Sequence, residues 1–438
     1  MVLKKIFSKN HFVFILFLVI SIIELGLQIS WLDCFDIYSK PIIYLFLSFW
    51  FLFIGYYIST LAPHQFLLKV RFRVNLKIVY FIIFIAAAYT AFIVYFDYQK
   101  VLSQFAINPH QSDVIPSIQI YVERFLSGKR VYNPIPMPGY QISPDYITFL
   151  WLPYIIPQVL NIDYRLFSLI LFYLFILIYS FYLIKKQSAN ISTILVPALG
   201  LIFLYLLVNN VPSVFGRTLE LTISVYYMIL VLTILNKNRF ILVIGILLCL
   251  LSRYSLSFWL VSYIIIILVN RGFKEFVIIN LYLLIGVLVL FIPFIIHDLN
   301  IFIEGLKYYG QATLGEWKVQ DWQALEEKPY TISRGYGFAI YFHDFIKGSI
   351  ERRLNTLKLV HLILSIFSGL SIFVIYKLKK SRIKDAKVFL MFGLKFFLMV
   401  FYIFIQIPYD YLFIVPLFLT VAILGELINK KKILILIS

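Results

Sequence analysis

The sequence predicts an all-α fold, a polytopic bundle of about twelve transmembrane helices with two long extracytoplasmic loops. Of the 438 residues, 62% are hydrophobic and 14% are charged, whereas soluble proteins carry about 25% charged residues. Apolar runs that reach the roughly 20 residues needed to cross a bilayer recur along the whole chain. Because lipid offers no hydrogen-bond partner, each run is expected to form a helix. Residues 1–438 are therefore expected to form a single transmembrane domain.

Ten apolar runs have the length of a membrane span. The first follows a basic N-terminus without a small-residue cleavage site, so we expect it to be retained. A further run at 240–270 is too long for one span and is interrupted near Arg253, which predicts two short helices. The run 145–160 is short and contains prolines, which predicts a re-entrant segment. The ten spans are expected near 12–30, 41–61, 78–97, 165–184, 191–209, 218–235, 275–296, 356–376, 388–406 and 410–428.

Clusters of lysine and arginine predict the orientation of the chain. The formal charge is +18, but the cations form short clusters beside apolar runs, as in cytoplasmic loops, and not the continuous surface that nucleic acid requires. Clusters at both ends place the N- and C-termini in the cytoplasm, and the protein in the inner or plasma membrane. If 145–160 does not cross, the loops 98–145 and 297–353 both lie outside and can enclose one site.

The first outer loop combines an acidic residue with an amphipathic segment. Asp113 precedes residues 115–126, where apolar side chains recur at 3 and 4 residue spacing. This spacing predicts a juxtamembrane helix with one face on the membrane surface, and Gly128 is expected to end it. Three prolines and a glycine in the following VYNPIPMPGY predict a loop without regular structure.

About fifty residues of this region resemble the first extracytoplasmic loop of the GT-C glycosyltransferases, integral-membrane enzymes that use polyprenyl-phosphate sugars. The likeness is greatest to the mannosyltransferase type. It departs in two features, because two additional apolar spans precede the loop and SPDY replaces the usual Tyr-Pro-Pro. The matching positions are Asp113, the helix end from Tyr121 to Gly128, Tyr132, Pro144, Tyr146, Pro153 and Pro157.

The resemblance implies transfer of a sugar from a polyprenyl-phosphate donor to a lipid-linked glycan or other acceptor, with Asp113 as the catalytic base. Inversion at the sugar requires a carboxylate that accepts the proton of the attacking hydroxyl. A departing phosphate is already a stable anion, so no general acid is needed. The alternative is that Asp113 caps the helix that follows it, and the two roles are compatible.

Five further residues are candidates for substrate binding. Arg253 stands between two apolar helices, where a guanidinium can bind the donor phosphate or serve as an interfacial anchor. Arg334 and His343, in the second outer loop, are candidates for contacts with phosphate or acceptor sugar. Asp145 adjoins the re-entrant segment and either faces the site or caps the next helix, and Tyr132 is implicated by the resemblance.

The sequence indicates neither a cofactor nor a metal site, although a divalent cation is compatible with the acids Asp33 and Asp36. These two acids also suit a solvated turn. Cys34 and Cys249 match no metal or redox spacing and are expected to be free thiols. The expected partners are the polyprenyl-phosphate sugar, a glycolipid or glycan acceptor, and membrane lipids.

Lys395 lies deep within an apolar run, and we expect it to pair with an internal acid such as Glu24 or Glu220, or to help bind phosphate. Two other functions remain open. An O-antigen-type polymerase is expected to carry arginine-rich outer loops, and a lipid-linked oligosaccharide transporter is expected to carry a cationic central cavity.

Overall fold

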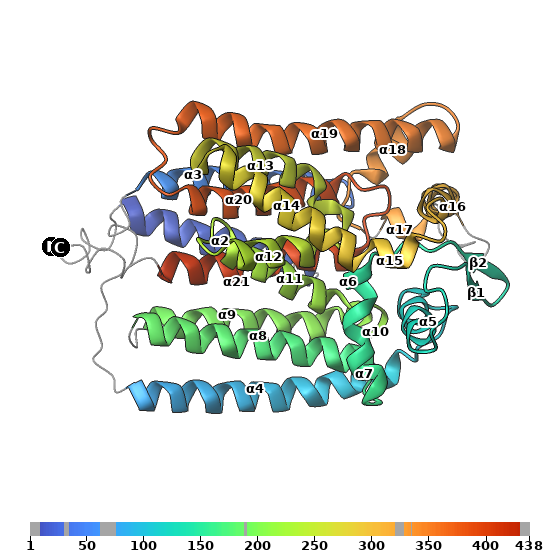
Figure 1. Cartoon of the computed structure of the whole chain (residues 1–438), viewed down its shortest axis with the longest axis horizontal. Coiled ribbons are helices and arrows are strands. Elements are labelled where there is room, and N and C mark those ends of the chain that lie inside the picture. Colours follow the sequence, from blue (N-terminus) through green and yellow to red (C-terminus); the bar gives the residue numbers. More distant parts are fainter. Residues whose placement is uncertain are drawn as a thin grey trace.

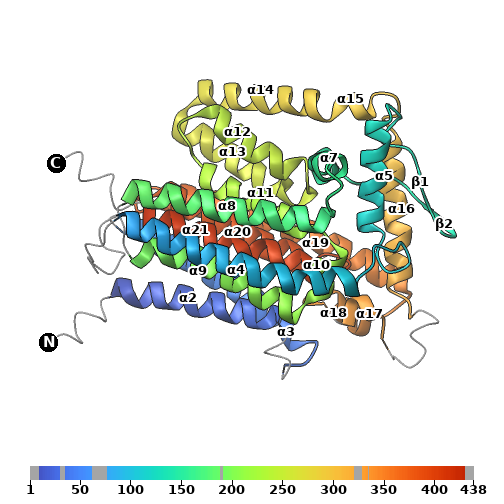
Figure 2. The ribbon, with the colours of Figure 1, turned by 90° about the horizontal axis from the view of Figure 1, so that it is seen from below.

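The computed structural model describes residues 9–29, 35–61, 76–187, 191–319, 328–333 and 335–429. Long helices lie roughly parallel and form one bundle (Figure 1). The first helix begins, and the last helix ends, at one end of this bundle. Shorter helices and a small hairpin cover the opposite end, which we call the outer end (Figure 2).

All twelve apolar segments singled out in the sequence form helices. Within the described residues, seven helices are long and apolar enough to cross a membrane, and four more are apolar but shorter. The chain is therefore a helical, membrane-embedded protein, while the count of twelve crossings stays a prediction. The twelve helices are α2 (Lys9–Gln28), α3 (Ser39–Thr60), α4 (Leu76–Gln104), α8 (Tyr164–Gln187), α9 (Ile191–Asn210), α11 (Glu220–Thr233), α12 (Arg239–Leu250), α13 (Ser257–Arg271), α14 (Phe273–Leu290), α19 (Ile350–Lys379), α20 (Ala386–Ile403) and α21 (Ile414–Asn429).

Helices α20 and α21 form the centre of the bundle and are buried over most of their length. Gly55 allows α3 to approach α20 closely, because a Cβ atom there would lie 2.2 Å from Cβ of Phe392. Small residues have this role in membrane helix pairs, where close packing replaces the hydrophobic driving force. On the periphery, α14 and α19 expose apolar side chains such as Leu288 and Phe367, as expected for helices that face lipid.

A fully buried ion pair joins α2 to α20. Nζ of Lys395 lies 2.7 and 2.9 Å from the two carboxylate oxygens of Glu24 and donates to the carbonyl of Pro416 at 2.6 Å. Both side chains are 0% exposed. The predicted pairing of Lys395 with an internal acid is confirmed, and Glu24 is its partner, while Glu220 pairs elsewhere.

The first outer loop contains the predicted amphipathic helix, α5 (Val114–Leu126), followed by Gly128 in the left-handed region at φ 67°. The prediction for VYNPIPMPGY was wrong, because β1 (Ile135–Met137) and β2 (Tyr140–Ile142) form an antiparallel hairpin. A two-strand ribbon has two free edges, and proline is tolerated on an edge strand. Gly139 at φ 83° supplies the turn.

The segment 145–160 does not form a helix that runs along the bundle. It folds into α6 (Thr148–Trp151), the 3₁₀ turn η1 (Leu152–Tyr154) and α7 (Ile155–Val159) at the outer end (Figure 1). The chain then enters α8 from that end. That this segment re-enters the membrane stays a prediction. Helix α4 continues to Gln104 and so shortens the first outer loop.

The described part of the second outer loop is mostly helical. It contains α16 (Ile301–Glu316), α17 (Tyr330–Ser333) and α18 (Ala339–Phe345), and it ends where α19 begins. Figure 2 shows α16 and α5 lying across the same end of the bundle, so both long loops gather there. The other short elements at this end are α10 (Pro212–Arg217), η2 (Tyr254–Leu256), α15 (Ile292–Ile295) and η4 (Asp410–Phe413).

Candidate functional site

Asp113 stands at the N-cap position, directly before α5, but its side chain makes no capping hydrogen bond. Its backbone is helical, with φ −85° and ψ −7°, and no side-chain donor or cation in the described part of the chain contacts the carboxylate. Burial raises the pKa of Asp113, and its own backbone N–H partly offsets this rise. The carboxylate is thus partly withdrawn from water and remains available to a ligand.

The aromatic side chains behind α5 hold it in place. Tyr121 is fully buried and packs against Tyr132, Tyr146 and Trp151, with ring centroids 5.5, 6.1 and 6.3 Å away. Arg124 extends from the last turn and donates to three carbonyls of the following loop, among them that of Asn133 at 2.6 Å. These contacts anchor the helix that carries Asp113 to the re-entrant segment and to the hairpin.

Asp145 faces the same region from the stretch between β2 and α6. Burial and, to a smaller extent, the negative charge of Asp113 raise the pKa of Asp145 to about 7, against the opposite effect of Arg253. Ile147, not Asp145, occupies the N-cap of α6, so the capping alternative for Asp145 was wrong. The two carboxyl groups are close enough to influence each other and form the centre of the candidate site.

The second outer loop supplies one wall of this site. Gly305 of α16 packs against the first loop, since a Cβ atom there would lie 2.6 Å from the carbonyl oxygen of Pro144. Tyr308 and Tyr309 follow on the same helix. Burial raises the pKa of Tyr308, and the charges of Asp113 and Asp145 raise it further. Both loops therefore contribute to one polar region, as the predicted topology requires.

Three more residues adjoin the carboxyl pair. Burial and the nearby charges of Asp145 and Asp113 raise the pKa of Tyr146. Burial also raises the pKa of Glu316, at the end of α16, with a smaller contribution from Asp113. Tyr409 comes from the segment after α20. Of these three residues, the sequence pointed only to Tyr146, through the resemblance, because a pattern within one segment says nothing of its contacts with another.

Arg253 lies at the predicted break between α12 and α13, and there it forms an ion pair with Glu220 at the start of α11. Its side chain is 24% exposed, against 5% for Glu220. The next residue, Tyr254, donates from its hydroxyl to the carbonyl of Asp145 at 3.1 Å. Arg253 therefore borders the site with part of its charge already neutralised.

The other predicted binding residues have different surroundings. Tyr132 is buried, and its hydroxyl accepts from Nε1 of Trp151 at 3.1 Å, so it belongs to the aromatic support of the site. His343 lies in a separate polar cluster, where its Nδ1 and Nζ of Lys328 contact opposite oxygens of Asp344 at 2.6 and 2.9 Å. Arg334 lies outside the described residues. The assignment of all three to substrate binding stays a prediction.

The described residues contain no group of three His, Cys, Asp or Glu side chains that could hold a metal ion. Of the predicted acid pair, Asp33 lies outside these residues. Asp36 accepts hydrogen bonds from the backbone N–H groups of Tyr38 at 3.1 Å and Ser39 at 2.6 Å, which is the solvated-turn alternative. Cys249 is a free, buried thiol.

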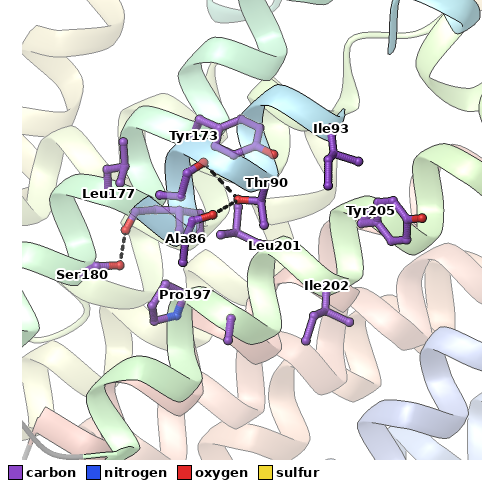
Figure 3. Close-up of a pocket in the computed structure, with 13 residues that line it drawn as sticks. Ala86, Thr90, Ile93, Tyr173, Leu177, Ser180, Pro197, Leu201, Ile202 and Tyr205 are labelled. Carbon is purple, nitrogen blue, oxygen red and sulfur yellow. Dashed lines mark hydrogen bonds between the residues drawn. The ribbon is translucent and has the colours of Figure 1, made fainter. Parts of the chain in front are cut away.

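An apolar cavity of 330 Å³ lies elsewhere, between α4, α8 and α9 (Figure 3). Two hydroxyl groups on its wall donate to the backbone, Thr90 to the carbonyl of Ala86 at 2.8 Å and Ser180 to that of Ile176 at 2.5 Å. The cavity shares no residue with the carboxyl pair, and its lining contains no acidic, basic or histidine side chain.

No protein-family model matches this chain. No curated protein and no solved structure matches it either. The functional argument therefore rests on the geometry of the site and on the resemblance of the first outer loop.

The raised pKa of Asp145 predicts a pH-dependent loss of stability. An unfolded aspartic acid ionises near pH 4, whereas the folded protein retains the proton up to about pH 7. The contribution of Asp145 to the free energy of unfolding is therefore fully present below about pH 4. It is lost as the pH rises through the folded pKa. Asp145→Asn is expected to remove this slope, as measured by thermal unfolding of the purified protein across this pH range. The exposed control Asp298→Asn is expected to behave like wild type. Parallel plots of melting temperature against pH for Asp145→Asn, wild type and this control would contradict the prediction.

Proposed function

We propose that this protein is a GT-C-type glycosyltransferase that moves one sugar from a polyprenyl-phosphate donor to a lipid-linked glycan or other acceptor. The observation that carries the proposal is Asp113, a partly buried carboxylate without a cationic partner among the described residues, at the start of an amphipathic helix on the outer end of a membrane bundle. A second carboxyl, Asp145, faces it. The arrangement suits proton abstraction from a hydroxyl at the membrane surface.

In the proposed mechanism, Asp113 accepts the proton of the acceptor hydroxyl as its oxygen attacks C1 of the donor sugar. The bond from C1 to the phosphate oxygen breaks at the same time, the sugar inverts its configuration, and polyprenyl phosphate leaves as an anion. Burial raises the pKa of Asp113, which makes its carboxylate a stronger base. Asp145, whose pKa of about 7 leaves it partly protonated, limits the negative charge that the departing phosphate meets.

The surroundings of the buried cations weigh against transport of a lipid-linked oligosaccharide. Lys395 is bound by Glu24 and Arg253 by Glu220, and the cavity in the bundle is apolar. A transporter for anionic lipid-linked glycans needs cations that are free to meet its cargo. We therefore place glycosyl transfer first, with an O-antigen-type polymerase as the second candidate.

The deciding experiment is an assay of purified protein with a panel of polyprenyl-phosphate sugars and separate lipid-linked acceptors. Release of polyprenyl phosphate with one sugar added to the acceptor supports the proposal. Growth of a polymer from preassembled lipid-linked repeat units, without use of any monosaccharide donor, would indicate the polymerase instead.

The proposed membrane orientation is tested by cysteine labelling in a background with both native cysteines replaced. Arg130 is exposed at the outer end, and Lys379 is exposed as the last residue of the long helix α19. Arg130→Cys is expected to react with an impermeant maleimide on intact cells, whereas Lys379→Cys reacts only after permeabilisation, because basic loops remain in the cytoplasm. The reverse pattern would place the carboxyl pair on the cytoplasmic side.

A further inference from the structure

Arg217, the last residue of α10, is a half-buried cation without an acidic partner among the described residues. Its Nε atom is buried and makes no hydrogen bond. The guanidinium lies over the ring of Phe105, 5.4 Å from the centroid, a contact that does not neutralise charge. A partly desolvated guanidinium is costly unless an anion meets it.

The position of Arg217 is next to the proposed base. Oγ of Ser112, the neighbour of Asp113, donates to the carbonyl of Arg217 at 3.1 Å. One hollow at the start of α5, with a volume of only 10 Å³, is lined by Arg217, Ser112, Asn108 and Gln111 among others. Its wall combines one cation with polar side chains that can donate hydrogen bonds.

A separate ion pair holds this region together, so Arg217 is not needed for that purpose. Arg165 donates to the carbonyls of Phe105 at 2.5 Å and Gly216 at 3.0 Å, and its charge is met by Asp163 at 2.7 Å. Gly216 also allows α10 to contact α4, because a Cβ atom there would lie 2.5 Å from Phe105. Arg165 clamps the end of α4 to α10 and leaves the guanidinium of Arg217 free for a ligand.

We propose that Arg217 binds the phosphate group of an anionic isoprenoid lipid, which under the proposed function is the donor. A planar guanidinium can donate two parallel hydrogen bonds to phosphate oxygens, a geometry that an ammonium does not offer. The sequence made Arg253 one candidate for this role, but Arg253 already forms an ion pair with Glu220. A donor held by its phosphate at Arg217 carries its sugar beside Asp113.

The test is binding of farnesyl phosphate, farnesol and inorganic phosphate to the purified full-length protein in detergent. Arg217→Met keeps the apolar stem that covers Phe105 and removes the charge. It is expected to weaken farnesyl phosphate binding by about tenfold or more, the loss typical of a removed charge-assisted hydrogen bond, and to leave farnesol binding unchanged. Arg217→Lys is expected to fall between Arg217→Met and wild type. The matched control is Arg130→Met at an exposed position of the same end, which is expected to bind like wild type.

Three results would overturn the inference. One is farnesyl phosphate binding by Arg217→Met within twofold of wild type. Another is an equal loss of farnesol binding, which would assign Arg217 to packing. The third is displacement of farnesyl phosphate by an equal concentration of inorganic phosphate, which would make free phosphate the ligand. If the wild type transfers sugar but Arg217→Met binds farnesyl phosphate as the wild type does, this inference is refuted and the proposed function is not. If binding depends on Arg217 but no donor supports sugar transfer, the proposed function is refuted and this inference is not.

Discussion

Asp113→Asn is expected to lower sugar transfer by about 10²–10⁴-fold, the usual contribution of a general base, with little change in thermal stability or donor binding. The amide has nearly the shape of the carboxylate but cannot accept the proton of the acceptor hydroxyl. No side-chain partner in the described residues depends on the lost charge, so the fold has no reason to change. The measurement is initial transfer rate at saturating donor and acceptor, beside the melting temperature.

The matched control for this variant is Asp298→Asn. Asp298 is exposed at the same end, and its Oδ1 accepts from the backbone N–H of Asn300 at 3.0 Å, a bond that an amide oxygen can also accept. This control is expected to keep wild-type activity. Transfer by Asp113→Asn within a few-fold of wild type would remove Asp113 from the mechanism. Asp145, the other carboxyl of the pair, would then be the candidate base.

The membrane helices could be predicted from the sequence because each depends on a local property. A run of about 20 apolar residues must form its hydrogen bonds internally in lipid, wherever the other helices lie. The break at Arg253 and the amphipathic α5 have the same local origin. Even the pairing of Lys395 could be foreseen, because a buried cation needs an acid and apolar segments contain few.

The candidate site was harder to predict because it depends on contacts between distant segments. Asp113 was found through the loop that carries it, but its proximity to Asp145 and to Tyr308 of α16 depends on how the two outer loops pack together. The hairpin was missed because proline was treated as excluding strands, which holds for central strands and not for edges. Arg217 gives no local signal, since its lack of an acidic partner is a property of the folded chain.

The second large effect concerns Arg253 and Glu220, for which sequence and structure suggest different roles. Arg253→Met leaves the Glu220 carboxylate buried without its cation, and breaking one partner of a buried pair costs about 3–5 kcal/mol. We therefore expect the single variant to unfold at a markedly lower temperature and to lose transfer activity. This result alone does not distinguish a structural pair from a phosphate-binding arginine, because both roles predict loss of activity.

The double variant Glu220→Gln/Arg253→Met separates these roles. Replacing a buried ion pair by neutral groups of similar volume is often close to neutral for stability, so the double variant is expected to regain most of the thermal stability that Arg253→Met loses. If Arg253 serves mainly to neutralise Glu220, transfer also returns and the donor KM stays within a few-fold of wild type. A double variant as stable as wild type but with a donor KM raised tenfold or more would show that Arg253 binds the phosphate. We expect recovery, because the carboxylate of Glu220 already contacts the guanidinium that the donor would need, whereas Arg217 has no such partner among the described residues.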